Sequence, residues 1–145
     1  MLVLVDTPIW SLALRRKDAD LNSREQRFTQ ALRKLIQDGR AQLVGPVRQE
    51  LLSGLREEAG FKKLRDHLRA FEQASLYVVD YEEAARLNNQ CRTRGIAGSA
   101  IDFLICAAAL RRGWQVFTTD HDFLRYSTVF PLRLYKVPRG DQWLT

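Results

Sequence analysis

Cysteine and histidine are scarce in this chain of 145 residues, which has two of each. Cys91 and Cys106 show neither CxxC nor cysteine–histidine ligand spacing, which excludes a disulfide framework and a zinc motif. We expect both cysteines to be reduced packing residues. Long apolar stretches are missing too, because an uncharged run such as Phe103 to Leu110 is far shorter than the roughly 20 residues that cross a bilayer.

Motifs for targeting and for several chemistries are also absent. Met1 to Asp6 lacks the basic region and cleavage site of a signal peptide, so we expect a cytoplasmic protein. The sequence has no GxxxxGK-Ser/Thr or GxGxxG phosphate loop, and no GxSxG motif for a nucleophilic serine. Without repeats, low-complexity tracts or linkers, residues 1–145 are expected to form a single domain.

The composition is globular, with 46% hydrophobic and 28% charged residues. The chain has 23 Lys plus Arg against 17 Asp plus Glu, a net charge of +6, and 18 of the cations are arginines. Guanidinium groups suit bidentate contacts, which favours a phosphate-bearing or acidic partner. Solvated helix faces are the other explanation, and from charge alone the simpler one, for residues such as Arg15, Arg16, Arg65 and Arg69.

Short apolar runs alternate with helical patterns along the chain. The runs predict five strands, at Leu2–Val5, Ala41–Val44, Leu76–Val79, Val116–Thr119 and Leu132–Val137. Helical spacing or helix-capping residues predict helices after Thr7-Pro8, over 28–36, after Gly45-Pro46, over 61–71, over 84–95 and over 101–112. This order predicts an α/β fold in which helices cover both faces of a mainly parallel, five-stranded sheet, in three α/β/α layers.

Four carboxylates lie where such a fold gathers functional groups, at the carboxyl ends of the strands. Asp6 and Asp120 follow predicted strands, and Asp102 lies in the first turn of a helix that Ser99 is expected to cap. Glu50 lies in the first turn or so after Gly45-Pro46. Close carboxylates repel one another unless a cation joins them, and oxygen ligands suit Mg²⁺ or Mn²⁺.

Each of these residues also has an ordinary structural explanation. Asp6 fits a turn, Glu50 favours a helix N-terminus, and Asp102 could pair with Ser99 in a capping arrangement. Asp80 also follows an apolar run and opens a helix. Spacing therefore does not choose between Asp6 and Asp80.

Four motifs in order resemble those of a PIN-domain ribonuclease of the VapC toxin type, and this resemblance covers nearly the whole chain. The motifs are Leu2-Val3-Leu4-Val5-Asp6-Thr7 with Trp10, Glu50-Leu51-Leu52 with Gly54, Asp102-Phe103-Leu104-Ile105-Cys106-Ala107-Ala108, and Thr118-Thr119-Asp120-His121-Asp122-Phe123. Two departures are Cys106, where alanine is more usual, and His121, where a charged residue is common.

The resemblance implies an acidic quartet with two supporting hydroxyls, from Thr7 and Thr118. The quartet, as catalytic residues and metal ligands, falls on Asp6, Glu50, Asp102 and Asp120. Asp122 is then expected to order the loop more than to bind metal, and Asp80 to be a helix cap. His121 is expected to face solvent, because metal-dependent phosphodiesterases activate water without a histidine.

The implied activity is an endoribonuclease in which Mg²⁺ or Mn²⁺ activates water against an RNA phosphodiester bond. The resemblance also implies a homodimer and a small antitoxin whose C-terminal segment covers the acidic site. Amphipathic helices around 61–71 and 24–36 offer a groove for a partner helix, or else complete the core. A housekeeping RNA-processing nuclease and a non-catalytic binding module remain alternatives.

Overall fold

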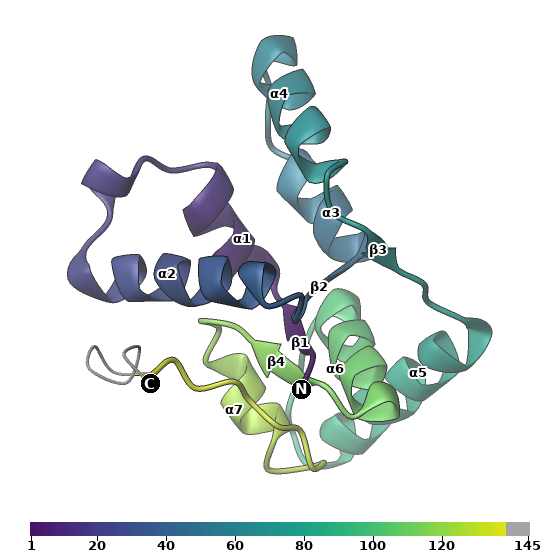
Figure 1. Cartoon of the computed structure of the whole chain (residues 1–145). Helices are drawn as coiled ribbons and strands as arrows, with labels where there is room; N and C mark the ends of the chain where they lie inside the picture. The colour runs from purple at the N-terminus through teal and green to yellow at the C-terminus, as the bar shows by residue number, and fades with distance from the viewer. Residues whose placement is uncertain (139–145) are drawn as a thin grey trace.

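A computed structural model of the protein describes residues 1–138 (Figure 1). Within these residues the centre is a four-stranded, all-parallel sheet with strand order β3-β2-β1-β4. The strands are β1 (Val3–Val5), β2 (Ala41–Val44), β3 (Gln73–Ala74) and β4 (Gln115–Phe117). The expected α/β fold with a parallel sheet is therefore confirmed, with one strand fewer than predicted.

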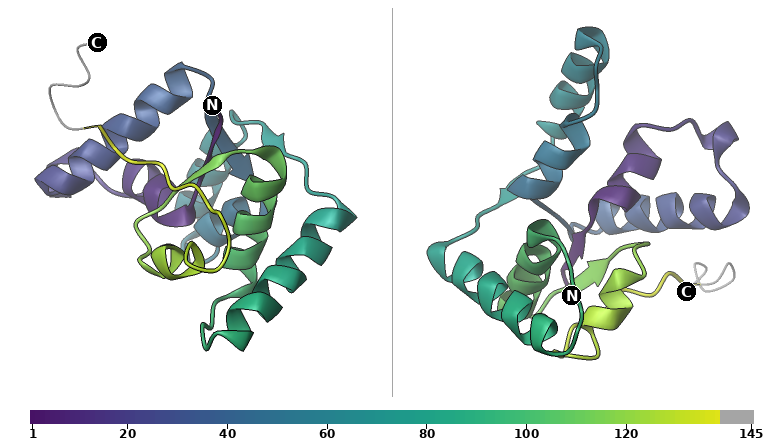
Figure 2. Two further views of the ribbon diagram at one scale, coloured as in Figure 1. Left: turned by 90° about the horizontal axis from the view of Figure 1, so that it is seen from below. Right: turned by 180° about the vertical axis from the view of Figure 1, so that it is seen from behind.

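Helices flank this sheet. They are α1 (Thr7–Leu14), α2 (Ser23–Gln37), α3 (Gly45–Leu52), α4 (Glu58–Leu68), α5 (Val78–Thr93), α6 (Ala100–Arg112) and α7 (Asp122–Tyr126), with a 3-10 helix at Asp18–Asp20. The pair α1 and α2 lies on one side of the sheet and the pair α5 and α6 on the other, while α4 extends away from it (Figures 1 and 2).

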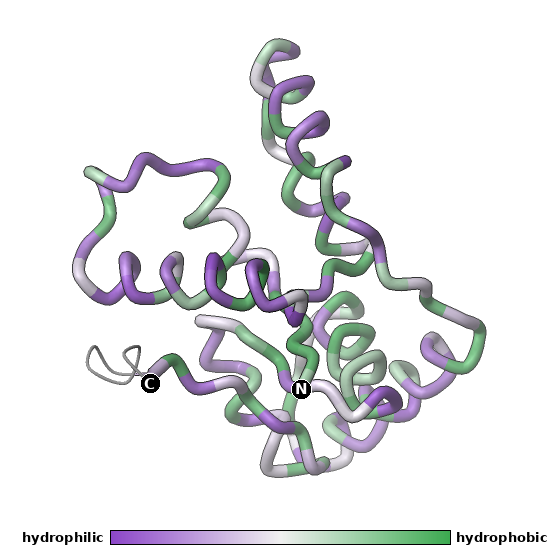
Figure 3. The backbone as a smooth tube through the Cα atoms, in the orientation of Figure 1, coloured by the Kyte–Doolittle hydropathy of each residue, from purple (hydrophilic) through white to green (hydrophobic). Residues whose placement is uncertain are grey.

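The core is built around β1 and α6. Val3, Leu4 and Val5 are all 0% exposed, as suits a parallel strand covered on both faces. Helix α6 contacts β1 and β4 and is buried from Phe103 to Ala109. Hydrophobic residues dominate both elements in Figure 3. This rigid centre fixes the two strand ends and the helix start from which the acidic side chains project.

The predicted strand at Leu76–Val79 is wrong. The third strand is β3, at Gln73–Ala74, and α5 begins at Val78. The cause is Asp80, whose Oδ2 accepts the N–H of Tyr77 at 2.7 Å and so starts the helix. Val78 is 74% exposed, so this β-branched run lies at the surface and not in a central strand.

The predicted fifth strand at Leu132–Val137 is reduced to one parallel bridge between Val116 and Leu134. Val116 exchanges backbone hydrogen bonds with Arg133 and Tyr135, at 2.9 and 2.8 Å. Since β4 ends at Phe117, it offers only a three-residue strand for this segment to pair with.

Asp80 caps α5, as expected, and also binds two arginines. Its carboxylate is 0% exposed and accepts hydrogen bonds from Arg111 at 2.6 Å and from Arg112 at 2.7 and 2.9 Å. These guanidinium groups, Arg112 above all, hold the pKa of Asp80 well below its usual range. The ion cluster ties the start of α5 to the end of α6. Cys91 and Cys106 are buried on the same two helices.

Over residues 1–138, no helix is both long and apolar enough to span a membrane.

Candidate acidic site

The predicted acidic residues lie at the carboxyl ends of β1 and β4 and on the helices that start there or pack beside them. Asp6 directly follows β1 and is the N-cap of α1, while Asp102 lies in the first turn of α6. Asp120 lies between β4 and α7. Glu50 lies in the second turn of α3, one turn later than predicted. Adjacent parallel strands thus present their ends to a single site.

Asp6 is the most buried of these carboxylates, with 5% exposure. Its Oδ1 accepts the N–H of Thr7 at 2.8 Å, and its Oδ2 accepts the hydroxyl of Thr118 at 2.8 Å. Burial, together with the smaller effect of the negative charges of Asp102 and Glu50, raises the pKa of Asp6 to about 6 despite these hydrogen bonds. The three carboxylates therefore interact electrostatically.

The two threonines predicted as supporting hydroxyls both contact acidic side chains. Thr7 is not the N-cap of α1, because Asp6 has that position; the Thr7 hydroxyl donates instead to Oε2 of Glu50 at 2.8 Å. The Thr118 hydroxyl donates to Asp6 and accepts the N–H of Asp120 at 3.0 Å. Each threonine thus links parts of the chain that are distant in sequence.

Asp102 is half-buried on α6. Ser99 caps this helix, because its hydroxyl oxygen accepts the backbone N–H of Asp102 at 3.0 Å. Oδ2 of Asp102 accepts the hydroxyl of Tyr126 at 2.7 Å. Burial raises the pKa of Asp102, and the charges of Asp120 and Asp122 add to this effect. Hydrogen bonds with Tyr126 and Ser99 lower the pKa but do not offset the rise. No motif in the sequence pointed to Tyr126.

Three carboxylates come close enough to share a cation. One oxygen each from Asp102, Asp120 and Asp122 lie within 4.8 Å of one another. Asp122 was expected mainly to order the loop; its N–H does so by donating to Asp120 at 2.9 Å, but its carboxylate also joins this group. Asp6 and Glu50 lie outside that 4.8 Å group.

The donor set suits a hard divalent cation. All the clustered donors are carboxylate oxygens, which are the ligands that Mg²⁺ and Mn²⁺ prefer, and the described group contains no cysteine or histidine. Burial is the main cause of the raised pKa of Asp102, and the charges of Asp120 and Asp122 add a repulsion that a cation would relieve. His121 is exposed beside the group and is not one of its members.

A parallel sheet with an acidic cluster at its carboxyl edge defines an α/β protein with a candidate metal centre. Residues 3–129 match the PIN domain, and the chain belongs to the PIN domain family.

Two solved structures are similar in fold. FitAcB from Neisseria gonorrhoeae superposes with a TM-score of 0.73 at 20% sequence identity, covering 93% of this chain and 97% of that chain. VapBC2 from Rickettsia felis, bound to a DNA fragment from its promoter, superposes with a TM-score of 0.70 at 18% identity, covering 93% and 98% of the two chains. No curated protein matches the sequence.

Proposed function

We propose that this PIN domain is a metal-dependent endoribonuclease and the toxin of a toxin–antitoxin pair. The observation that carries the proposal is the group of Asp102, Asp120 and Asp122, with carboxylate oxygens within 4.8 Å of one another. A surface that only bound RNA would gain nothing from clustered negative charge next to phosphates. A bound cation would neutralise these charges and would explain why the carboxylates are close together.

The residues that would hold Mg²⁺ or Mn²⁺ are those of the acidic quartet, Asp6, Glu50, Asp102 and Asp120, together with Asp122. When bound, such an ion supplies charge stabilisation at the phosphate and a lowered pKa of coordinated water. The protein's own part is orientation: donors from Thr7, Thr118, Tyr126 and the backbone hold the carboxylates despite their repulsion.

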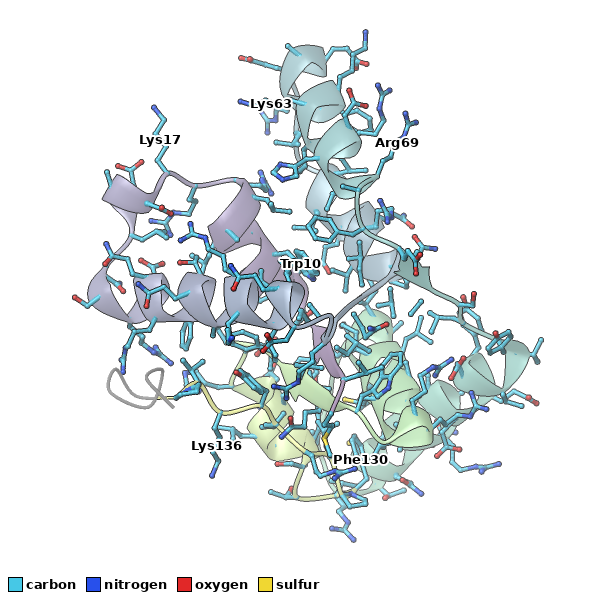
Figure 4. All side chains as sticks on the ribbon, viewed as in Figure 1. Trp10, Lys17, Lys63, Arg69, Phe130 and Lys136 are labelled. Carbon is cyan, nitrogen blue, oxygen red and sulfur yellow. The ribbon has the colours of Figure 1, made fainter. Side chains whose placement is uncertain are left out.

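The net charge of +6 supports a polyanionic substrate. Arginines and lysines away from the site attract the phosphate backbone over longer range, which offsets the negative charge of the site itself. Figure 4 shows Lys63 on α4, and Arg69 directly after it, projecting into solvent. The choice of RNA over DNA rests on the resemblance of the motifs to those of VapC ribonucleases.

An antitoxin partner is supported by the resemblance of the motifs to those of VapC toxins and by the fold that the chain shares with FitAcB and VapBC2. A cavity of about 270 Å³ lies between the end of α1 and α4, with a floor of Leu14, Leu55 and Leu64 and a rim that includes Arg15 and Lys63. We propose that a helix of the antitoxin binds in this cavity.

The other helix expected to shape such a groove is α2. Its Ala31, Leu32 and Leu35 are buried in the core, so this face of α2 completes the fold. The proposed binding cavity therefore lies between α1 and α4 and not between α2 and α4.

A homodimer also belongs to the proposal. Tyr77, Val78, Val79 and Tyr81 are exposed at the start of α5, beside an apolar depression between α5 and α6. Exposed apolar side chains gathered in this way support a protein interface.

The test is cleavage of a mixed cellular RNA pool by purified, antitoxin-free protein with Mg²⁺, with Mn²⁺ and with excess EDTA. Asp102→Asn is the test variant, and Asp38→Asn is the matched control, because Asp38 precedes β2 at the opposite end of the sheet. We expect discrete fragments with either metal, lost with EDTA and in Asp102→Asn but not in Asp38→Asn. Full cleavage by Asp102→Asn, or none by the folded wild type with either metal, would overturn the proposal.

A further inference from the structure

The hydroxyl of Tyr126 holds one oxygen of the Asp102 carboxylate. The Oη atom donates to Oδ2 of Asp102 at 2.7 Å, across 24 positions of sequence and from a different helix, α7. We propose that Tyr126 is a positioning residue of the metal site, which fixes Asp102 so that its other oxygen, Oδ1, is directed to the cation. This inference rests on the proposed function of the site.

The tyrosine ring is held rigidly. Tyr126 is 0% exposed, and its ring centroid lies 5.0 Å from that of Phe103 and 5.2 Å from that of Phe123. A buried tyrosine hydroxyl needs a polar partner, and here that partner is a carboxylate of the site. Because packing fixes the ring, the position of the hydroxyl is fixed as well, and it constrains Asp102.

Gly98 makes room for this hydroxyl. A Cβ atom at this position would overlap Oη of Tyr126 and would lie 2.8 Å from its Cζ and 2.9 Å from Cε2 of Phe103. Real Cβ atoms do not approach so closely, so the side chain would have to move. The glycine just before the cap of α6 thus permits the contact between Tyr126 and Asp102.

The contact completes a pattern across the acidic residues. Hydroxyl donors hold Asp6 and Glu50, and a backbone N–H holds Asp120. The carboxylate of Asp102 is repelled by the charges of Asp120 and Asp122, and it accepts its hydrogen bond from the hydroxyl of Tyr126. A held carboxylate needs less reordering when a cation binds, and loss of such partners typically costs about 10- to 100-fold in metal affinity or activity.

The test is Mn²⁺ binding, measured by titration calorimetry on the full chain. Tyr126→Phe removes only the hydroxyl and keeps the ring in the core. Tyr135→Phe is the matched control, because that ring packs 5.0 Å from Phe117 and its hydroxyl makes no side-chain hydrogen bond within residues 1–138. We expect the Kd for Mn²⁺ to rise about 10-fold in Tyr126→Phe, at the low end of that range, and to stay within about twofold in Tyr135→Phe.

The outcomes separate this inference from the proposed function. If wild type binds Mn²⁺, Asp102→Asn weakens the binding and Tyr126→Phe does not, the role of Tyr126 is overturned and the metal site stands. If wild type binds no Mn²⁺, or Asp102→Asn binds it as wild type does, the metal site fails and the role of Tyr126 fails with it. Equal losses in Tyr126→Phe and Tyr135→Phe would indicate a general structural effect and would also overturn the role of Tyr126.

A second measurement does not depend on the folding of any variant. In wild-type protein labelled with ¹³C at tyrosine Cζ, the Tyr126 signal should shift when Mg²⁺ is added, because Asp102 then shares its charge with the cation. The Tyr135 signal should not shift. A Tyr126 signal that is unchanged at saturating Mg²⁺ would contradict the inference.

Discussion

Thr118 and Asp6 are joined by a 2.8 Å hydrogen bond although 112 positions separate them in the sequence. The same Thr118 oxygen accepts the N–H of Asp120 at 3.0 Å. Because β1 pairs directly with β4, one hydroxyl can link the ends of both strands. The acidic site is therefore held by the sheet itself and not only by loops.

Thr118→Val should destabilise the protein by about 2 kcal/mol, because a nearly buried carboxylate loses a donor and the N–H of Asp120 loses an acceptor. Valine keeps the shape of threonine, so packing should change little. Urea denaturation of the metal-free protein measures the effect, and Thr118→Ser, which keeps the hydroxyl, should recover most of it. A valine variant as stable as wild type would show that this hydrogen bond contributes nothing.

Asp6 should make the metal-free protein less stable as the pH rises. Its pKa is about 6 in the folded protein against an ordinary 3.8, so the folded state favours the protonated form. The contribution is fully present below about pH 4 and is lost as the pH rises through 6, for a total of about 3 kcal/mol at 1.36 kcal/mol per pKa unit.

The comparison that isolates this effect is wild type against Asp6→Asn, by urea denaturation in EDTA between pH 4 and pH 7. Titrating groups that do not interact with Asp6, such as Asp80, contribute equally to both proteins and cancel, so the difference reports Asp6 together with its coupling to Asp102 and Glu50. Wild type should lose stability relative to the variant over this range. A constant difference would mean that the pKa of Asp6 is not raised in the folded protein.

Asp80→Asn should destabilise the protein by about 3 to 5 kcal/mol, because a fully buried carboxylate is removed from beside Arg111 and Arg112. The surface pair of Glu83 and Arg86 provides the control: Glu83→Gln should cost no more than about 1 kcal/mol. Thermal or urea unfolding measures both. Equal small effects would show that the buried cluster does not tie α5 to α6 as described.

The proposed partners predict sizes in solution. Light scattering should give a dimer for the purified protein and a larger complex after co-expression with a small neutralising protein encoded beside it. Tyr81→Glu, which places a charge in the apolar patch of α5, should shift the dimer towards monomer. A monomer under all these conditions would contradict both the homodimer and the partner.

The sequence was informative where local pattern and burial agree. The apolar run Leu2–Val5 predicts a strand, and Val3–Val5 is a buried one; Ser99 caps α6 as predicted. At Leu76–Val79 the β-branched residues pointed to a strand, but the interaction of Asp80 with Tyr77 and with two distant arginines decided in favour of a helix. That decision depends on a tertiary contact, which a local pattern does not contain.

The site followed the same rule. The predicted strand ends and helix starts were enough to place Asp6, Asp102 and Asp120 at the same edge of the sheet. The resemblance of the motifs selected Asp6 over Asp80. The positions of Asp122 and Tyr126 were not predictable in this way, since both depend on how α7 folds back against the start of α6. Contacts between separate helices set those two side chains.

The central claim is that the carboxylates of Asp102, Asp120 and Asp122 surround a divalent cation. The most direct measurement is anomalous X-ray diffraction from crystals grown with Mn²⁺, which locates the metal without reference to activity. The account predicts an anomalous peak coordinated by oxygens of this group. A well-ordered site with no peak between these carboxylates, or Mn²⁺ bound only elsewhere, would contradict it.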